Sequence, residues 1–377
     1  MKRVLLVSYL PPSTEHAGGQ RLLDLYGELK KIQPELHLTL VTCGDQGYDL
    51  ALLKDIFDEV HCIAPSQFSK RGLSALNLGS PGFSLIDVQY HQSGALIGAL
   101  RALWPSATLI FSPMESQLRA AKIALTQGKR RLWRTWRNTL GLALNASMEI
   151  VYALKADKVV TVSDSDRDAL ALLKQAGKVI CLPTCMSPQN ALPIAAPEPS
   201  KGNETIVFFA YFGSRTNQEA LYWFVQKVHP AICQALPNYR FRLVGHGINE
   251  SVLENCAVEQ IDVVGPVSTI TEALSGAAIG ISPALSGAGV RGKIHQYAAF
   301  GLPCVASPIA CEGLSYKDGE SIFIAGNADD FSEACITLLQ DEKRRERAKE
   351  KAMAVCSTHY QWSAWRPEIA STYELNI

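Results

Sequence analysis

The sequence predicts an α/β protein with two doubly wound parallel sheets, one in each half of the chain. Short β-branched runs alternate with longer segments of helical spacing. A proline-rich stretch interrupts this alternation once, and the alternation then restarts. Because strand–helix–strand series build parallel sheets, two such series predict two Rossmann-like domains that face each other across a cleft. We expect the first domain over residues 1–184 and the second over residues 204–357.

In the first half, buried parallel strands are expected wherever a short apolar run is bounded by turn residues. A helix is expected over Gln20–Ile32, because Leu22, Leu23, Tyr26 and Leu29 fall on one face. The predicted strands are Arg3–Tyr9, Leu36–Thr42, Leu85–Tyr90, Thr108–Phe111, Lys158–Val162 and Lys178–Leu182.

Ser163 follows the fifth of these strands and opens a helix, so it is the expected N-cap. Asp164 and Asp166 form a D-x-D pattern that also suggests a metal ligand pair. We favour the helix cap.

The stretch Pro183–Asn203 holds five prolines and no periodic apolar pattern, which is typical of a stiff linker. We place that linker at residues 185–203. In doubly wound sheets, ligands bind outside the carboxyl ends of the strands. The strands predicted after the linker are Thr205–Phe209, Arg240–Val244, Ile261–Val264, Ala278–Ser282, Cys304–Ser307 and Ser321–Ala325.

Composition narrows the class of protein. The chain has 377 residues, and its 36 Lys and Arg balance 36 Asp and Glu, which argues against a nucleic-acid binder. Ten cysteines occur without a C-x-x-C pair, so buried reduced thiols are expected. The N-terminus resembles a first strand rather than a signal peptide. No stretch has the 18 uninterrupted apolar residues of a spanning helix, so we expect a cytoplasmic protein.

The most informative segment is a glycine-rich turn, Gly287–Lys293, between an apolar strand and a helix. Closely spaced glycines let backbone N–H groups approach an anion, and a helix N-terminus adds positive charge. Arg291 and Lys293 stand in the first turn, where the helix dipole disfavours cations, so the segment predicts a bound phosphate or diphosphate. The alternative is a glycine turn with two solvated cations.

Two general motifs fit this turn incompletely. As G-x-G-x-x-G it matches a dinucleotide fingerprint, but it follows roughly the fourth strand of its domain instead of the first. As G-x-x-x-x-G-K it matches a P-loop in which Ile294 replaces the Ser or Thr that binds magnesium.

A third match is a family resemblance that covers nearly the whole chain and is strongest from residue 205 onward. The segment Lys293–Val305 resembles the K-I/L-x-E-A-x-A-x-G-x-P-V-V signature of the retaining glycosyltransferases of family four, which adopt the two-domain GT-B fold. The supporting segments are Phe208–Leu221, Arg242–Gly247, Val263–Val267, Pro11–Arg21 and Ile86–His91.

This resemblance implies the transfer of a sugar from a nucleotide-diphosphate sugar to a glycan, glycolipid or other acceptor. It also implies retention of configuration, no metal or other cofactor, and a place in bacterial cell-surface polysaccharide or glycoconjugate synthesis. The catalytic residues it implies are Arg291, Lys293, His91 and Glu115. The donor-binding residues it implies are Gly18, Gly19, Gly213, Arg215, His246, Pro266, Val267, Gly287, Gly289, Val290, Gly292 and Gln296. His16 is a further candidate for contact with a sugar hydroxyl.

The sequence also departs from the family. Two glutamates eight positions apart are replaced by Ala288 and Gln296, and the His-Asp pair after one strand is replaced by Ser112–Glu115. Gln296 can still bond a ribose diol, whereas Ala288 cannot replace a carboxylate. The alternatives are therefore a GT-B protein that binds a nucleotide without turnover, a nucleotide-sugar epimerase and, least supported, a NAD-dependent dehydrogenase.

Two further segments carry expectations. Lys129–Arg137 holds five cations and two tryptophans, which predicts contact with the inner face of a membrane, or else ion pairs with Glu149 or Glu115. Residues 358–377 resemble the segment that packs back on the first domain in GT-B proteins.

Overall fold

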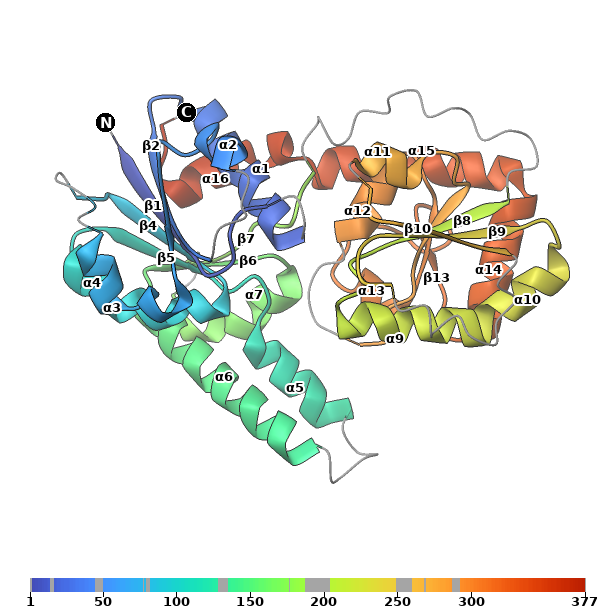
Figure 1. Ribbon diagram of the computed structural model, residues 1–377, viewed down its shortest axis with the longest axis horizontal. Coiled ribbons are helices and arrows are strands. Elements are labelled where there is room, and N and C mark those ends of the chain that lie inside the picture. The colour runs from blue at the N-terminus through green and yellow to red at the C-terminus, as the bar shows by residue number, and fades with distance from the viewer. Residues whose placement is uncertain are drawn as a thin grey trace. The chain divides into compact units, whose positions relative to one another are not determined.

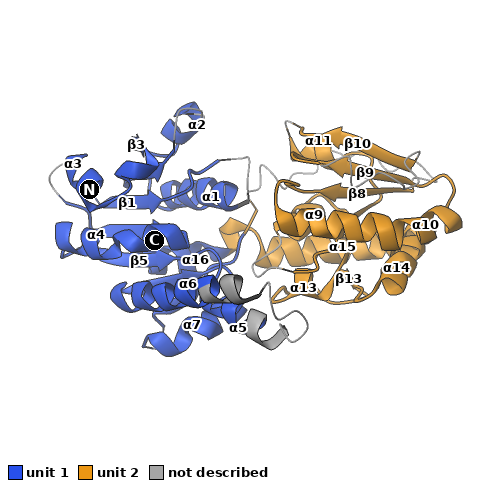
Figure 2. Ribbon diagram, turned by 60° about the horizontal axis from the view of Figure 1, so that its bottom comes forward, with its two compact units in different colours: residues 1–184, 365–377 blue, residues 185–364 orange. Residues whose placement is uncertain are grey.

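The computed structural model (Figure 1) describes residues 2–13, 17–44, 50–76, 78, 82–127, 135–175, 177–186, 204–248, 260–267, 269–286 and 292–376. The chain divides into two units (Figure 2). The N-terminal unit comprises Met1–Thr184 and Trp365–Ile377, and the C-terminal unit comprises Cys185–Ala364. Each unit is built on its own parallel sheet, which confirms the predicted fold class.

The N-terminal unit contains a seven-stranded parallel sheet in the order β3-β2-β1-β4-β5-β6-β7. The apolar core on one face joins β1, β4 and β5 to α4 and α6. The opposite face of the central strands is covered by α1 and the C-terminal α16. The strands are β1 Arg3–Ser8, β2 His37–Cys43, β3 Glu59–Ile63, β4 Leu85–Gln89, β5 Thr108–Ser112, β6 Lys158–Thr161 and β7 Val179–Cys181. The helices are α1 Ala17–Ile32, α2 Leu50–Lys54, η1 Pro65–Gln67, α3 Lys70–Ala75, η2 His91–Leu96, α4 Ile97–Leu103, α5 Gln117–Gln127, α6 Thr135–Lys155, α7 Asp164–Leu170, η3 Ala171–Leu173 and α16 Arg366–Tyr373.

The C-terminal unit contains a six-stranded parallel sheet in the order β10-β9-β8-β11-β12-β13. Separate apolar clusters cover its two faces. The strands are β8 Thr205–Phe209, β9 Arg240–Val244, β10 Ile261–Gly265, β11 Ile279–Ser282, β12 Cys304–Ala306 and β13 Phe323–Ile324. The helices are α9 Arg215–Trp223, the π-helical turn η4 Phe224–Val228, α10 His229–Ala235, α11 Ile270–Leu274, α12 Gly292–Ala299, α13 Pro308–Cys311, α14 Ala328–Gln340, α15 Glu342–His359 and, where the units join, η7 Trp362–Trp365.

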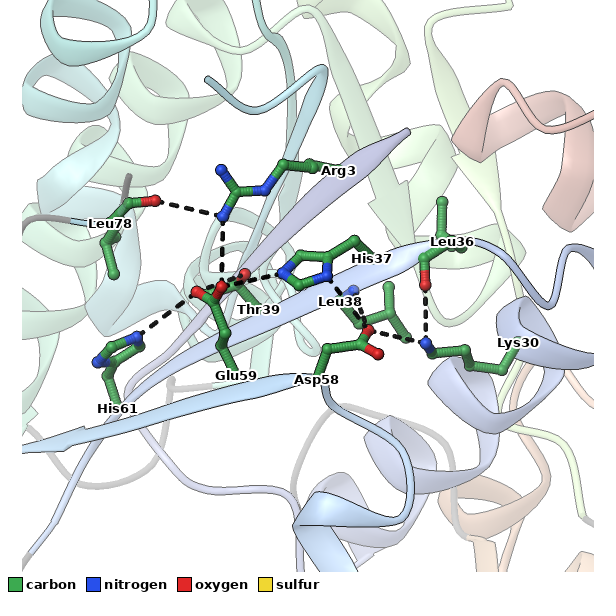
Figure 3. Close-up of polar contacts among 10 residues, drawn as sticks. All are labelled: Arg3, Lys30, Leu36, His37, Leu38, Thr39, Asp58, Glu59, His61 and Leu78. Atoms are coloured by element: carbon green, nitrogen blue, oxygen red, sulfur yellow. Dashed lines mark hydrogen bonds and ion pairs between the residues drawn. The ribbon is translucent and has the colours of Figure 1, made fainter. Parts of the chain in front are cut away.

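The edge strand β3 is absent from the sequence prediction. Its first residue, Glu59, accepts a hydrogen bond from Thr39 at 3.4 Å and lies 3.1 Å from His37 Nε2 and 3.6 Å from Arg3 Nη2 (Figure 3). These contacts join the amino ends of β1, β2 and β3, which is the edge of the sheet opposite to the ligand-binding end. A strand that is polar at its start lacks the continuous apolar run by which buried strands are recognised.

A buried polar cluster attaches α16 to the N-terminal sheet. Asp87 on β4 is fully buried and accepts hydrogen bonds from Tyr373 at 2.5 Å, Gln89 at 2.8 Å, Tyr26 at 3.0 Å and Ser112 at 3.1 Å. Burial raises the pKa of Asp87, and these four hydrogen bonds act in the opposite direction. One carboxylate therefore joins α1, β4, β5 and the end of the chain.

The remaining expectations about local structure have mixed outcomes. Ser163 caps α7 by accepting a hydrogen bond from Asp166 N, which confirms the predicted cap. The nine cysteines that the structure describes form no disulfide with one another. Five of them are buried and three are partly buried, but Cys62 is exposed, so the prediction that the cysteines are buried is wrong for Cys62. Among the described residues, no group of three or more His, Cys, Asp or Glu side chains is placed to hold a metal ion. No helix in the described part of the chain is long and apolar enough to cross a membrane.

The hydrogen bonds to Asp87 predict that loss of the Tyr373 hydroxyl destabilises the N-terminal unit. Tyr373→Phe removes the shortest hydrogen bond to a buried carboxylate, and we expect it to lower the free energy of unfolding of the N-terminal unit by about 1–3 kcal/mol. Hydrogen exchange of the β4 amides in urea measures this loss. The control is Tyr222→Phe, at an exposed tyrosine of the C-terminal unit. Equal protection of β4 in both variants would contradict the role given to this contact.

Candidate functional site

Both sheets have a point at which the strand order reverses, between β1 and β4 in the N-terminal unit and between β8 and β11 in the C-terminal unit. Loops that leave such neighbouring strands run in opposite directions and open a crevice at their carboxyl ends. In the C-terminal unit the described parts of these loops are residues 210–214 and 283–286. In the N-terminal unit they are residues 9–13 and the turn from β4 into η2. The predicted site residues fall mainly in or beside these loops.

The loops after β8, β9 and β10 pack closely at glycines. Phe212 N donates a hydrogen bond to His246 O at 2.7 Å, and Gly245 N donates one to Gly265 O at 2.7 Å. A Cβ on Gly247 would lie 2.6 Å from Gly213 N, and the φ of Gly247 is +78°. These positions exclude larger side chains, so the backbone itself forms this part of the site.

Lys293 lies in the first turn of α12, where the dipole of the helix disfavours a cation. Its ammonium donates a hydrogen bond to Asn217 Oδ1 on α9 at 3.2 Å and lies 4.6 Å from the centre of the Phe208 ring at the end of β8. The N-terminal turns of α9 and α12 therefore meet at the β8–β11 switch point. Sequence reasoning singled out Lys293 but missed Asn217 and Phe208, which come from the neighbouring strand and helix.

Arg215 is highly exposed, and its Nε lies 2.8 Å from Glu219 one turn later in α9. Ser286 donates a hydrogen bond to the other oxygen of Glu219 at 3.3 Å. Glu219 therefore connects α9 to the loop after β11. It was not among the predicted site residues, although its spacing of four from Arg215 marks a helix pair.

The other predicted donor-binding residues are placed as follows. Gln296 is partly buried on α12, His246 and Pro266 are exposed, and Val267 is partly buried. Gly292 begins α12, and a Cβ added there would lie more than 4 Å from its neighbours among the described residues. Gly287, Ala288, Gly289, Val290 and Arg291 lie outside the described residues, and so does His16 in the N-terminal unit.

In the N-terminal unit, the switch point brings Gly18, Tyr90 and His91 together. Tyr90 follows β4 with a φ of +68°, a conformation that is costly for a bulky residue and is concentrated at functional sites. Its hydroxyl is buried and lacks a hydrogen-bond partner among the described residues, as does Nδ1 of His91. Burial lowers the pKa of His91, so its imidazole is neutral at neutral pH. Sequence reasoning identified Gly18 and His91 but missed Tyr90, whose strained backbone has no signal in the sequence.

The turn after β5 carries the predicted residue Glu115, which is partly buried beside Met114 at a φ of +65°. The neighbouring carboxylate of Glu149, on α6, is buried and accepts hydrogen bonds from Ser116 Oγ, Gln117 N and Leu118 N. These bonds cap the amino end of α5. Residues 128–134, which hold most of the predicted basic segment, lie outside the described residues.

The close approach of Gly18 to Tyr90 predicts that a larger residue at position 18 destabilises the fold and that a smaller side chain at position 90 restores its stability. A Cβ on Gly18 would lie 2.5 Å from the Tyr90 hydroxyl, so Gly18→Ala should lower the free energy of unfolding by about 1–3 kcal/mol. Adding Tyr90→Phe removes that oxygen and should restore most of the loss. Thermal unfolding measures both variants.

The matched control is Gly98→Ala in α4, where nothing lies near the added methyl group. An alanine there should raise stability by about 0.5–1 kcal/mol. If Tyr90→Phe fails to rescue Gly18→Ala, the contact does not explain why residue 18 is glycine.

Comparison with known proteins gives one family match. Residues 203–341 match the model of the group 1 glycosyl transferases. A curated relative from Klebsiella pneumoniae, named as an uncharacterized 44.6 kDa protein in the cps region, is 24% identical over 133 residues. That match spans 33% of this chain and about a third of the relative's length.

Solved structures match the whole fold. Anabaena HepE in complex with UDP superposes with a TM-score of 0.75 at 14% identity, covering 99% of this chain and 100% of HepE. Sucrose-phosphate synthase from Thermosynechococcus elongatus gives a TM-score of 0.73 at 15% identity, covering 99% and 98% of the two chains. At these identities the likeness shows the fold. The chain therefore shares the fold of these structures, and residues 203–341 match the group 1 glycosyl transferases.

Proposed function

We propose that this chain transfers a sugar from a nucleotide-diphosphate sugar to a glycan, glycolipid or other acceptor. The observation that carries the proposal is the position of Lys293, in a helical first turn at the β8–β11 switch point, beside the amino end of α9. A cation at this position is stabilised when an anion occupies the site. The match to group 1 glycosyl transferases in the same unit supports a sugar nucleotide as that anion. HepE of the same fold has been solved with UDP.

The proposed chemistry depends on the charge that develops on the departing diphosphate. In this reaction the bond between the anomeric carbon and the diphosphate oxygen breaks, and an acceptor oxygen bonds to that carbon and loses its proton. Lys293, Arg291 and the N–H groups at the start of α12 would stabilise the leaving diphosphate. Neutral His91 would hydrogen-bond to a sugar or acceptor hydroxyl in the N-terminal unit, without adding charge.

Retention of configuration and a role in bacterial surface polysaccharide synthesis are the finer parts of the proposal. The resemblance of Lys293–Val305 to family four supports retention. The relative in the cps region of Klebsiella pneumoniae supports the role. An NMR assignment of the anomeric configuration of donor and product tests retention directly, because inversion exchanges α and β.

A second candidate function is nucleotide binding without turnover, because Ala288 and Gln296 replace two family glutamates. Gln296 lies partly buried on α12, where a neutral amide can contact a ribose. Nucleotide release from donor in the presence of acceptor extracts separates the two candidates. Release that is lost in an Arg291→Ala, Lys293→Ala double variant supports transfer. Binding of UDP or another nucleoside diphosphate without release from any donor supports the alternative.

The role of Lys293 predicts a binding defect. Among UDP, GDP, ADP and dTDP, we expect at least one to raise the melting temperature, because a ligand of the folded state stabilises it. Lys293→Ala should lower the affinity for that nucleotide by about tenfold or more, because a charged hydrogen bond to the diphosphate is lost.

The matched control is Lys227→Ala, an exposed lysine of the same unit, which should leave affinity unchanged. Equal affinity in the wild type and Lys293→Ala would remove Lys293 from the diphosphate site.

A further inference from the structure

The outer face of α6 is an exposed apolar stripe. Leu144, Met148, Val151 and Leu154 are 57%, 44%, 44% and 54% exposed, and their spacing of four, three and three places them on one side of the helix. The other exposed residues from Gly141 to Leu154 are Gly141, Ala143 and Ser147, which are small and uncharged. Contiguous exposed apolar side chains of this kind mark an interaction site more often than scattered ones.

The stripe continues onto η3, where Leu172 is 96% exposed. Lys174, which follows η3, donates a hydrogen bond to Leu154 O at 3.0 Å, so η3 lies against the end of α6. We call Leu144, Met148, Val151, Leu154 and Leu172 the α6 patch.

The exposed charges next to the α6 patch are positive. Between Asn138 and Leu154 the only charged side chain is Glu149, and it is buried in its hydrogen bonds to the start of α5. Lys155 is exposed at the carboxyl end of the helix. In the sequence, the amino end follows the run Lys129–Arg134. The described part of the helix therefore exposes no carboxylate next to the patch.

The acidic residues that follow α6 in the chain are already paired. Asp157 lies 2.5 Å from Arg101, and Arg167 contacts both Asp164 and Asp168. A second copy of this chain docked on the same face would add another Lys155 and no exposed carboxylate from the described part of α6. An anionic surface, by contrast, complements the exposed apolar side chains, Lys155, and the run of cations that precedes α6 in the sequence.

We propose that the α6 patch docks the N-terminal unit on an anionic lipid surface. The helix would lie in the plane of the interface, with its leucine, methionine and valine side chains among the acyl chains and Lys155 at the headgroups. This inference is independent of the proposed sugar transfer, because it concerns a different face and is tested without donor or acceptor.

The test is sedimentation of the purified full chain with vesicles of phosphatidylcholine, with and without phosphatidylglycerol. We expect the wild type to bind the anionic vesicles, and binding to fall as salt is raised. Leu144→Gln, Met148→Gln and Val151→Gln together should weaken this binding by about tenfold or more. The matched control is Leu50→Gln with Tyr222→Gln, two exposed apolar residues elsewhere, which should bind as the wild type does.

A second pair of variants separates lipid from protein partners. Met148→Lys and Met148→Glu remove the same apolar surface but add opposite charges, so the lysine variant should bind anionic vesicles more tightly than the glutamate variant. Absence of wild-type binding, or equal binding by the two variants, would overturn the proposal. So would a wild-type dimer in sedimentation equilibrium that both Met148 variants dissociate, because the patch would then be a dimer interface.

Discussion

The pairing of β1 with β4 and of β8 with β11 is the constraint on which both candidate sites depend. Each pair is parallel, so its two strands end at the same edge of the sheet, and the helices that follow the two strands pack on opposite faces of the sheet. The loops that follow then diverge and leave room for a ligand. Gly18 and Tyr90 meet because of the first pairing. Lys293 approaches Phe208 because of the second.

Buried carboxylates hold the elements around the N-terminal switch point. Asp87 joins β4 to α1 and α16, and Glu149 joins α6 to the start of α5. Burial raises the pKa of both groups, and the hydrogen bonds that each group accepts act in the opposite direction. Several hydrogen bonds to one buried carboxylate fix the positions of the groups that donate them. These two residues therefore orient the elements that carry Tyr90 and Glu115, instead of acting as acids or bases themselves.

Most central strands could be predicted from sequence because they are buried on both faces and are rich in valine, leucine and isoleucine. β3 could not, since its polar residues are accommodated by Arg3 and His37, which lie far away in the sequence. Long-range contacts also limited the prediction of the two candidate sites. Glycines and a lysine in a first turn are visible locally, whereas Asn217, Glu219 and Glu149 gain their roles through contacts 31–76 residues away. The positive φ of Tyr90 is likewise not marked by any local sequence pattern.

The surroundings of Lys293 bear on why a cation is kept where the helix dipole opposes it. The contacts of its ammonium described above are an amide oxygen and a ring face, both of which are neutral. Such contacts orient the charge but cancel little of it, in contrast to a carboxylate. An anion that binds beside these two helix N-termini would lower the electrostatic cost of the cation. The diphosphate becomes more negative as it leaves the sugar. This arrangement would therefore stabilise the departing diphosphate more strongly than the intact donor, and such a difference in stabilisation lowers the barrier of a reaction.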